Sequence, residues 1–246
     1  MTNMFTPPSL GYDRAITVFS PEGRLYQVEY ALEAVKRGWT TLGIRCRDGV
    51  VVAVEKKRIS PLVDPETMEK IWKVDDHIGI AYAGLASDGR VLIDRARIEA
   101  QIYRLIYDEP IDVEVITRRI SDLKQLYTQH AGVRPFGVSF IIAGVDRSGA
   151  RLYMTEPSGA YAGYHAVVIG AGSQTALEIL EKHYNQRMSM EEGIMLALKC
   201  MEAVVEGGLS VEKIEIAVAE VKTGRFDKLK AQEVRELIEK FREQMK

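Results

Sequence analysis

The sequence predicts an α+β protein built as a four-layer αββα sandwich, in which helices flank two stacked antiparallel sheets. Two observations predict this class. The expected strands come in consecutive hairpins instead of alternating with helices, which argues against a parallel Rossmann or barrel fold. The central helices come in two pairs, so each pair can cover one outer face. One more amphipathic helix precedes the first strand and another follows the last, and we expect a single domain over residues 1–246.

The extra N-terminal helix is expected over residues 20–37. Ser20 is a suitable N-cap, Pro21 suits the first helical position, and an acid follows in the first turn. Apolar residues then recur at helical spacing, at Leu25, Val28, Ala31 (or Leu32) and Val35. Residues 1–11, which contain Pro7-Pro8 and few apolar anchors, are expected to form a flexible leader.

The sandwich is expected over residues 38–226. Its strands are predicted at residues 40–46, 50–55, 71–74, 77–83, 138–145, 150–155 and 214–221, with short ones around Tyr161, Val167 and Phe226. Its helices are predicted at residues 87–107, after Pro110, and at residues 173–185 and 189–206. The continuous β-branched run at 50–55 indicates a strand buried on both faces. Ser189 and Glu192 form a capping box, and residues 227–246 an amphipathic C-terminal helix.

Composition excludes several classes of function. The formal net charge of −2, from 33 basic and 35 acidic residues, implies no general attraction to nucleic acid or anionic membranes. No apolar run approaches the roughly 18 residues that span a membrane, and the N-terminus lacks the features of a secretory signal, so we expect a cytoplasmic protein. Cys46 and Cys200 are expected to be buried thiols.

One glycine motif raises the possibility of nucleotide binding. Residues 167–176 combine a strand, Gly170-x-Gly172 and a helix start, as a dinucleotide site does. However, Thr175 holds the third small position, and no second parallel strand follows. We therefore favour a structural turn and keep a nucleotide-binding protein as a remote alternative. The four histidines lack metal-ligand spacing, and we expect no catalytic residue, cofactor or metal site.

The N-terminal part of the chain carries a specific motif. It reads Tyr12-Asp13-Arg14-Ala15-Ile16-Thr17-Val18-Phe19-Ser20-Pro21, then Gly23-Arg24-Leu25 and Gln27-Val28-Glu29-Tyr30-Ala31. This stretch resembles the N-terminal signature of proteasome α subunits, most closely the archaeal ones, and the likeness covers nearly the whole chain. It implies the sandwich of the Ntn-hydrolase superfamily.

The resemblance also implies a function and partners. Proteasome α subunits are non-catalytic and form seven-membered outer rings of the 20S core particle with other α subunits, against rings of catalytic β subunits. They gate the passage of unfolded polypeptides and dock an AAA+ ATPase activator by its C-terminal tails, in ATP-dependent, ubiquitin-independent degradation. The alternative within the same family is a β-type threonine protease subunit.

That alternative requires a free N-terminal threonine whose α-amino group acts as the base. The comparable place here is Gly38-Trp39-Thr40-Thr41. Cleavage after Gly38 would expose Trp39, which carries no nucleophile. Thr40 and Thr41 are therefore expected to be ordinary residues of the first strand.

The resemblance assigns a gate to the N-terminal part of the chain. Residues 1–11 would form the plug over the pore, and the open gate would be held by Tyr12, Asp13, Arg14, Pro21 and Tyr30. Phenols and a carboxylate are able to form hydrogen bonds across neighbouring copies, and Pro21 fixes a turn. Taken alone, Tyr30 fits a half-buried helix residue equally well.

The resemblance also assigns a docking pocket. Lys70, in Met68-Glu69-Lys70-Ile71, matches the lysine that receives the C-terminal carboxylate of an activator tail, and Gly38 and Leu85 match other pocket positions. A single ammonium in an apolar cleft is a suitable carboxylate receptor. Without the resemblance, a lysine before an apolar strand is expected to be solvated.

A third likeness concerns the loop that narrows the pore. Tyr127-Thr128-Gln129-His130-Ala131-Gly132 matches that loop, with His130, Ala131 and Gly132 at the constriction. Many relatives have Tyr and Gly where His130 and Ala131 stand. A ring of histidines would make the pore more cationic near pH 6.

Overall fold

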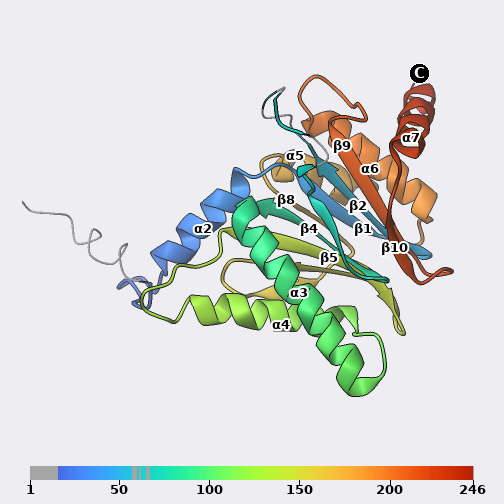
Figure 1. Cartoon of the computed structure of the whole chain (residues 1–246). Helices are drawn as coiled ribbons and strands as arrows, with labels where there is room; N and C mark the ends of the chain where they lie inside the picture. Colours follow the sequence, from blue (N-terminus) through green and yellow to red (C-terminus); the bar gives the residue numbers. More distant parts are fainter. Residues whose placement is uncertain (1–15, 57–59, 61, 65–66, 246) are drawn as a thin grey trace, which may run out of the picture.

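The computed structural model describes residues 16–56, 60, 62–64 and 67–245, and it shows two antiparallel sheets stacked between layers of helices (Figure 1). The first sheet contains β1 (Thr41–Arg45), β2 (Gly49–Glu55), β8 (Ala166–Ile169), β9 (Ile214–Glu220) and β10 (Arg225–Lys228), in the order β10-β9-β2-β1-β8. The second contains β3 (Ile71–Asp75), β4 (Ile78–Gly84), β5 (Val138–Asp146), β6 (Gly149–Thr155) and β7 (Tyr161–Gly163), in sequential order. The predicted αββα class is confirmed.

The helices cover both outer faces of this pair of sheets. They are α2 (Tyr26–Lys36), α3 (Ala86–Tyr107), α4 (Val113–Tyr127), α5 (Ser173–His183), α6 (Met190–Val204) and α7 (Ala231–Gln244). Helices α5 and α6 pack on the first sheet, whereas α3 and α4 pack on the second. Helix α2 lies at one end of the sandwich, where it contacts β4 and β5 (Figure 1).

Strand β2 shows how the layers share one core. All of its residues are buried, as the β-branched run predicts. Val50, Val52 and Val54 belong to the core between the two sheets, while Val51 and Ala53 pack under the helices of the first sheet. This alternation follows from the two-residue period of a strand. A third core lies between the second sheet and the pair α3 and α4.

The N-terminal helix begins later than predicted. Helix α2 starts at Tyr26, because residues 20–24 form a turn instead of a first helical turn. The Gly23 nitrogen donates to the carbonyl of Ser20 at 2.8 Å, and the Arg24 nitrogen donates to the Ser20 hydroxyl at 3.1 Å. Gly23 has a φ of +76°, outside the right-handed helical region. Ser20 therefore closes a turn, a local alternative to capping a helix.

The C-terminal helix is also shorter than the predicted 227–246. Asp227 and Lys228 belong to β10, where they pair with β9, and α7 begins only at Ala231. Pairing with the edge of the first sheet competes here with helix formation. The buried face of α7 consists of Val234, Ile238 and Phe241. Met245, directly after the helix, is exposed.

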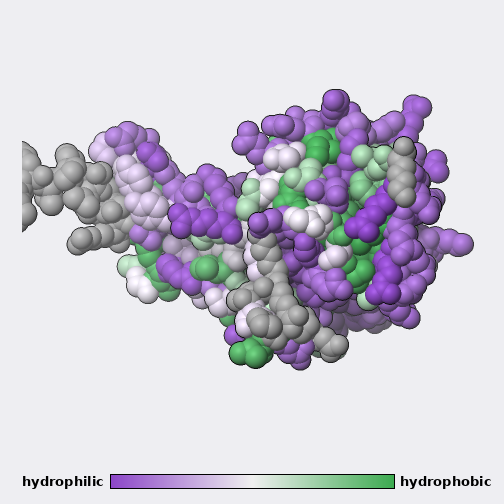
Figure 2. Space-filling view, turned by 90° about the horizontal axis from the view of Figure 1, so that it is seen from above, coloured by the Kyte–Doolittle hydropathy of each residue, from purple (hydrophilic) through white to green (hydrophobic). Residues whose placement is uncertain are grey.

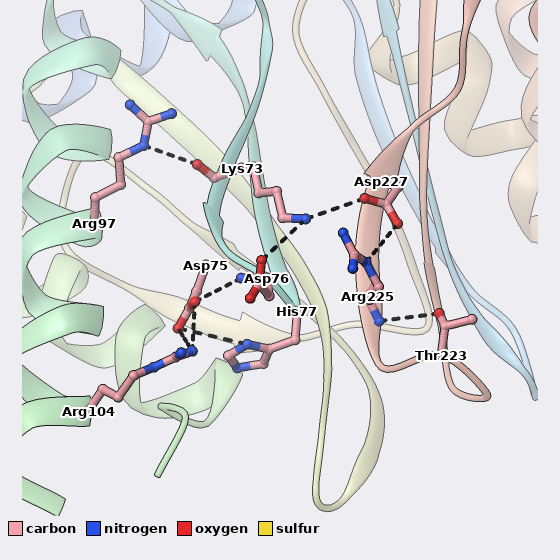
Figure 3. A network of polar contacts seen from close by, with 9 residues as sticks. All are labelled: Lys73, Asp75, Asp76, His77, Arg97, Arg104, Thr223, Arg225 and Asp227. Carbon is pink, nitrogen blue, oxygen red and sulfur yellow. Dashed lines mark hydrogen bonds and ion pairs between the residues drawn. The ribbon is translucent and has the colours of Figure 1, made fainter. Parts of the chain in front are cut away.

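A polar network connects the two sheets where the β3–β4 turn lies close to the β9–β10 turn (Figure 3). Lys73 of β3 lies 3.3 Å from the Asp227 carboxylate of β10 and 3.7 Å from that of Asp76. Asp75 is buried and accepts two hydrogen bonds of 2.9 Å from Arg104 of α3. These contacts fix α3 and both sheets relative to one another.

Both cysteines are buried, as predicted. Helix α6 passes so close to Cys46 that a Cβ at Gly193 would lie 2.4 Å from its Sγ atom. Burial raises the pKa of the Cys46 and Cys200 thiols to about 12. Thiols in this state are poor nucleophiles.

The surface is mixed in character. Seen from above, hydrophilic residues cover most of it and hydrophobic residues form smaller patches between them (Figure 2). The C-terminal half of α3 nevertheless exposes large apolar side chains, namely Ile98, Ile102, Leu105, Ile106 and Tyr107. No helix in the described ranges combines the length and the hydropathy that crossing a bilayer requires.

Candidate functional site

A cleft of about 450 Å³ opens beside the C-terminal end of α2. The aromatic side chains of Trp39, Trp72 and Tyr82 line it together with Lys70 and Gly38. Gly38 and Trp39 lie between α2 and β1, Lys70 directly precedes β3, and Trp72 and Tyr82 belong to β3 and β4. The structure thus brings Lys70 and Gly38 together, as the sequence predicts, although they lie far apart in the chain.

Lys70 is not the solvated side chain that its sequence position alone suggests, since only 4% of it is exposed. Its Nζ atom donates to the carbonyl of Trp39 at 2.9 Å and to the hydroxyl of Thr41 at 3.4 Å. The ring centroids of Trp39 and Tyr82 lie 5.4 and 5.6 Å from the same atom, within range of a cation–π contact. An ammonium has three N–H donors, so these hydrogen bonds to described residues leave one donor for a ligand.

The charge of Lys70 is sensitive to its surroundings. Burial lowers the pKa of Lys70 to about 7, and the carboxylates of Glu55 and Glu215 limit that decrease. The side chain is therefore about half protonated at neutral pH. An anion bound at Nζ would favour the ammonium form.

A second hollow of about 690 Å³ adjoins the cleft and is lined by Tyr30, Arg37, Gly38 and Leu85, among others. Gly38 borders both cavities. A Cβ at Gly38 would lie 2.3 Å from the Gly84 backbone nitrogen, so only glycine allows this close approach. Leu85 is partly exposed beside it. The three predicted docking residues therefore lie on one continuous surface.

The predicted gate residues are only partly described. Tyr12, Asp13, Arg14 and residues 1–11 lie outside the described residues. Pro21 is exposed in the turn before α2. Tyr30 on α2 is 51% exposed, and its ring stacks at 6.5 Å on Tyr26. Tyr30 is thus exposed instead of half-buried.

The loop with His130, Ala131 and Gly132 directly follows α4, and all three residues are exposed. His130 Nδ1 lies 2.8 Å from the carbonyl oxygen of Leu126 in the last turn of α4. Gly132 has a φ of +87°, a conformation that glycine adopts without strain. The histidine is thus attached to the end of the helix while the chain turns at Gly132.

Sequence reasoning missed an ion pair next to this loop. Asp88, in the first turn of α3, accepts hydrogen bonds from both terminal nitrogens of Arg134 at 2.6 and 2.8 Å and from the Gly137 nitrogen at 2.9 Å. The only signals in the sequence were an acid near a helix start and an arginine in a glycine-proline loop. The partners are separated by 46 positions in the chain, so nothing in a single sequence pairs them.

Of the two threonines at the comparable β-type position, Thr41 is the first residue of β1, as expected, whereas Thr40 directly precedes the strand. Both are buried. The backbone nitrogen of Thr40 donates to Glu55 at 3.1 Å, and the hydroxyl of Thr41 donates to the carbonyl of Tyr82 at 2.9 Å. The Thr40 nitrogen is an amide bonded to Trp39, so it cannot act as the amine base that this chemistry needs.

The glycine turn before α5 is explained by packing. A Cβ at Gly170, which has a φ of +96°, would lie 2.8 Å from the carbonyl oxygen of Gly38. The Ala171 nitrogen donates to that same oxygen at 2.8 Å, and the Gly172 nitrogen donates to the Thr40 hydroxyl at 3.1 Å. Amides that a nucleotide phosphate would need are thus already used, which favours the structural turn.

Comparison with known protein families gives two matches that together cover most of the chain. The family described as "Proteasome subunit" matches residues 35–219. The N-terminal signature of the A-type proteasome subunits matches residues 12–34. The second match contains all five residues predicted to hold the open gate.

Curated relatives agree with both matches. The proteasome subunit alpha of Saccharolobus islandicus (strain L.S.2.15 / Lassen #1) is 51% identical over 239 residues, which cover 96% of this chain and 99% of the relative. That of Saccharolobus solfataricus is 53% identical over 227 residues, covering 92% and 94%. That of Sulfolobus acidocaldarius is 52% identical over 238 residues, covering 96% and 98%.

Proposed function

The chain belongs to the proteasome α subunits, which form the non-catalytic ring of the 20S core, and on this premise we propose that it gates the passage of polypeptides and docks an activator. The active sites of the threonine protease complex lie on β subunits. In this proposal the chain controls the access of polypeptides to the proteolytic chamber and does not cleave them. We place this activity in the cytoplasm, on unfolded polypeptides.

The observation that carries the docking proposal is the environment of Lys70. Its ammonium lies in an aromatic cleft, and its hydrogen bonds go to the neutral oxygens of Trp39 and Thr41. A carboxylate supplied by a partner would gain a charge-assisted hydrogen bond there. The residues before that carboxylate would lie along the adjoining hollow at Gly38 and Leu85. This arrangement suits the C-terminal tail of an AAA+ ATPase activator.

The gate proposal rests on the exposed N-terminal features. Tyr30 presents its ring to the outside on α2, and Pro21 lies in an exposed turn just before that helix. In a seven-membered ring each copy would offer these groups to its neighbour. Tyr12, Asp13 and Arg14 would complete the cluster from the adjoining segment, and residues 1–11 would close the pore. The loop at His130 would form the constriction below it.

Assembly with other proteasome subunits accounts for the apolar end of α3. Leu105 is 85% exposed there, beside the exposed Ile106 and Tyr107. Contiguous exposed apolar side chains on a soluble protein mark interaction surfaces. We assign this end of α3 to contacts between subunits of the particle, since burial in an interface removes it from water.

The proposed function is tested on rings assembled with β subunits. The native mass should show rings or stacked rings, and deletion of residues 2–11 should raise the hydrolysis of a long fluorogenic peptide. A synthetic peptide with the C-terminal residues of an AAA+ activator should bind the wild-type particle and one carrying Lys182→Met, an exposed lysine on α5. It should bind a particle carrying Lys70→Met only weakly. A chain that stays monomeric with β subunits, or a Lys70→Met particle that binds the tail normally, would contradict the proposal.

A further inference from the structure

The first turn of α3 lies between the proposed docking surface and the proposed pore loop. On one side, Gly84 and Leu85 border the hollow, and Gly84 closely approaches Gly38. On the other side, the Leu85 nitrogen donates to the carbonyl of Gly137 at 2.9 Å. A Cβ at Gly84 would lie 2.2 Å from that same oxygen. Backbone therefore packs directly on backbone, without side chains that could absorb a displacement.

Asp88 strengthens the connection one turn further along. It is only 7% exposed and accepts two hydrogen bonds from Arg134, one from the nitrogen of Gly137 and a longer one, of 3.5 Å, from the Ser87 hydroxyl. Burial opposes its charge, yet the hydrogen bonds from Arg134 and Gly137 hold the pKa of Asp88 below its usual value. The paired guanidinium geometry is directional, so Arg134 must follow if Asp88 moves.

The loop between α4 and β5 is held at both of its ends, and the chain turns between them. On the helix side, the ring of Tyr127 packs against that of Phe136 in a tilted arrangement, with ring centroids 4.5 Å apart. On the sheet side, Arg134 and Gly137 are held by Asp88. Between these anchors Gly132 has a positive φ, and a Cβ added there would meet no described atom within 4 Å. Residues around Gly132 are thus able to change position while both anchors stay in contact.

We propose that Asp88 is a positioning residue that couples occupation of the tail-docking surface to the position of the pore loop. The inference rests on the proposed function, since it takes the hollow at Gly38 and Leu85 as the place where a tail binds. A tail there would press on the start of α3, and the Asp88–Arg134 pair would pass the shift to the loop at Gly132. Close-packed elements transmit such shifts instead of absorbing them.

The test uses particles assembled with β subunits and a synthetic activator-tail peptide with a free carboxylate. Two readouts are compared: the affinity of the peptide and the factor by which it stimulates hydrolysis of a long reporter peptide. The variants are Asp88→Asn and Arg134→Lys, the latter keeping the charge but losing the paired geometry. The matched control is Asp94→Asn, which removes another acid of α3 that forms ion pairs with Arg90 and Arg97 on its exposed side.

We expect both variants to bind the peptide within about twofold of wild type, while stimulation falls roughly fivefold or more, the usual range of coupling between sites. Asp94→Asn should behave as wild type. Full stimulation of a folded, ring-forming Arg134→Lys particle would overturn the inference. Loss of peptide affinity in step with stimulation would also overturn it, because Asp88 would then belong to the binding surface. A wild-type particle that fails to bind the peptide would overturn the proposed function itself.

Discussion

Docking at Lys70 should depend strongly on pH. The proposed ligand is a carboxylate, so the site must carry the ammonium form, yet burial lowers the pKa of Lys70 to about 7. Because the pKa is lowered, the free site loses its proton as pH rises through 7. Between pH 7 and pH 9 its charged fraction falls from about one half to about one hundredth, so tail affinity should weaken roughly 50-fold, or about 2 kcal/mol.

Other groups around the site do not share this dependence. A tail carboxylate stays ionised in that range, because its pKa is near 3.5. Burial raises the pKa of Tyr82 above its usual value, so this phenol stays neutral. The pH profile of tail binding therefore reports on Lys70.

The assay is fluorescence anisotropy of a labelled tail peptide against assembled rings at several pH values. Lys70→Arg should flatten the profile, since a guanidinium stays charged throughout. Lys70→Met should bind weakly at every pH, and the amide-capped peptide should not bind. Equal wild-type affinity at pH 7 and pH 9 would refute the reasoning, because either the lysine is not the receptor or its pKa is not lowered.

Three further predictions concern stability and the pore. Burial lowers the pKa of Lys124 to about 7, so between about pH 7 and pH 10 the unfolded chain binds more protons and the free energy of unfolding should rise with pH, by up to about 1.4 kcal/mol per unit. The free energy of unfolding is measured in urea at several pH values. Lys124→Met should reduce its rise with pH by the contribution of one proton, whereas the exposed control Lys182→Met should leave the rise unchanged. Equal pH slopes in the two variants would contradict a lowered pKa of Lys124. Ser189→Ala should lower the free energy of unfolding by about 1 kcal/mol, because the capping box with Glu192 is lost, and an unchanged thermal midpoint would count against it. His130→Tyr should remove a pH dependence of peptide passage between about pH 5.5 and pH 8; identical wild-type and variant profiles would exclude a role for the histidine.

Local patterns predicted the fold wherever local and tertiary preferences agree. The β-branched run of β2 is buried on both faces, and the capping box at Ser189 opens α6 as expected. The two errors lie at element ends. Near Ser20, side-chain bonding within a turn competes with capping, and at Asp227 pairing with a sheet edge competes with helix formation. Such competition is decided by neighbours that a single sequence does not reveal.

The site could be predicted only as far as the resemblance extends. It placed Lys70, Gly38 and Leu85 on one surface, which the structure also shows. The resemblance could not show that Lys70 is buried, because its burial depends on contact with Trp39, which lies 31 positions earlier in the chain. The ion pair between Asp88 and Arg134 could not be predicted for the same reason. Long-range contacts of single side chains leave no periodic signal.

The geometry around Lys70 also explains how a subunit without catalysis can use a buried lysine. In the β-type chemistry, the nucleophile would stand at the position of Trp39, which carries an indole here. The following nitrogen, on Thr40, is an amide that donates to Glu55, so it cannot supply the α-amino base of that chemistry. The Nζ atom of Lys70 thus lies beside the comparable position, where its hydrogen bonds to Trp39 and Thr41 leave one of the three donors of its ammonium form. The docking proposal assigns this donor to an anion supplied from outside the chain.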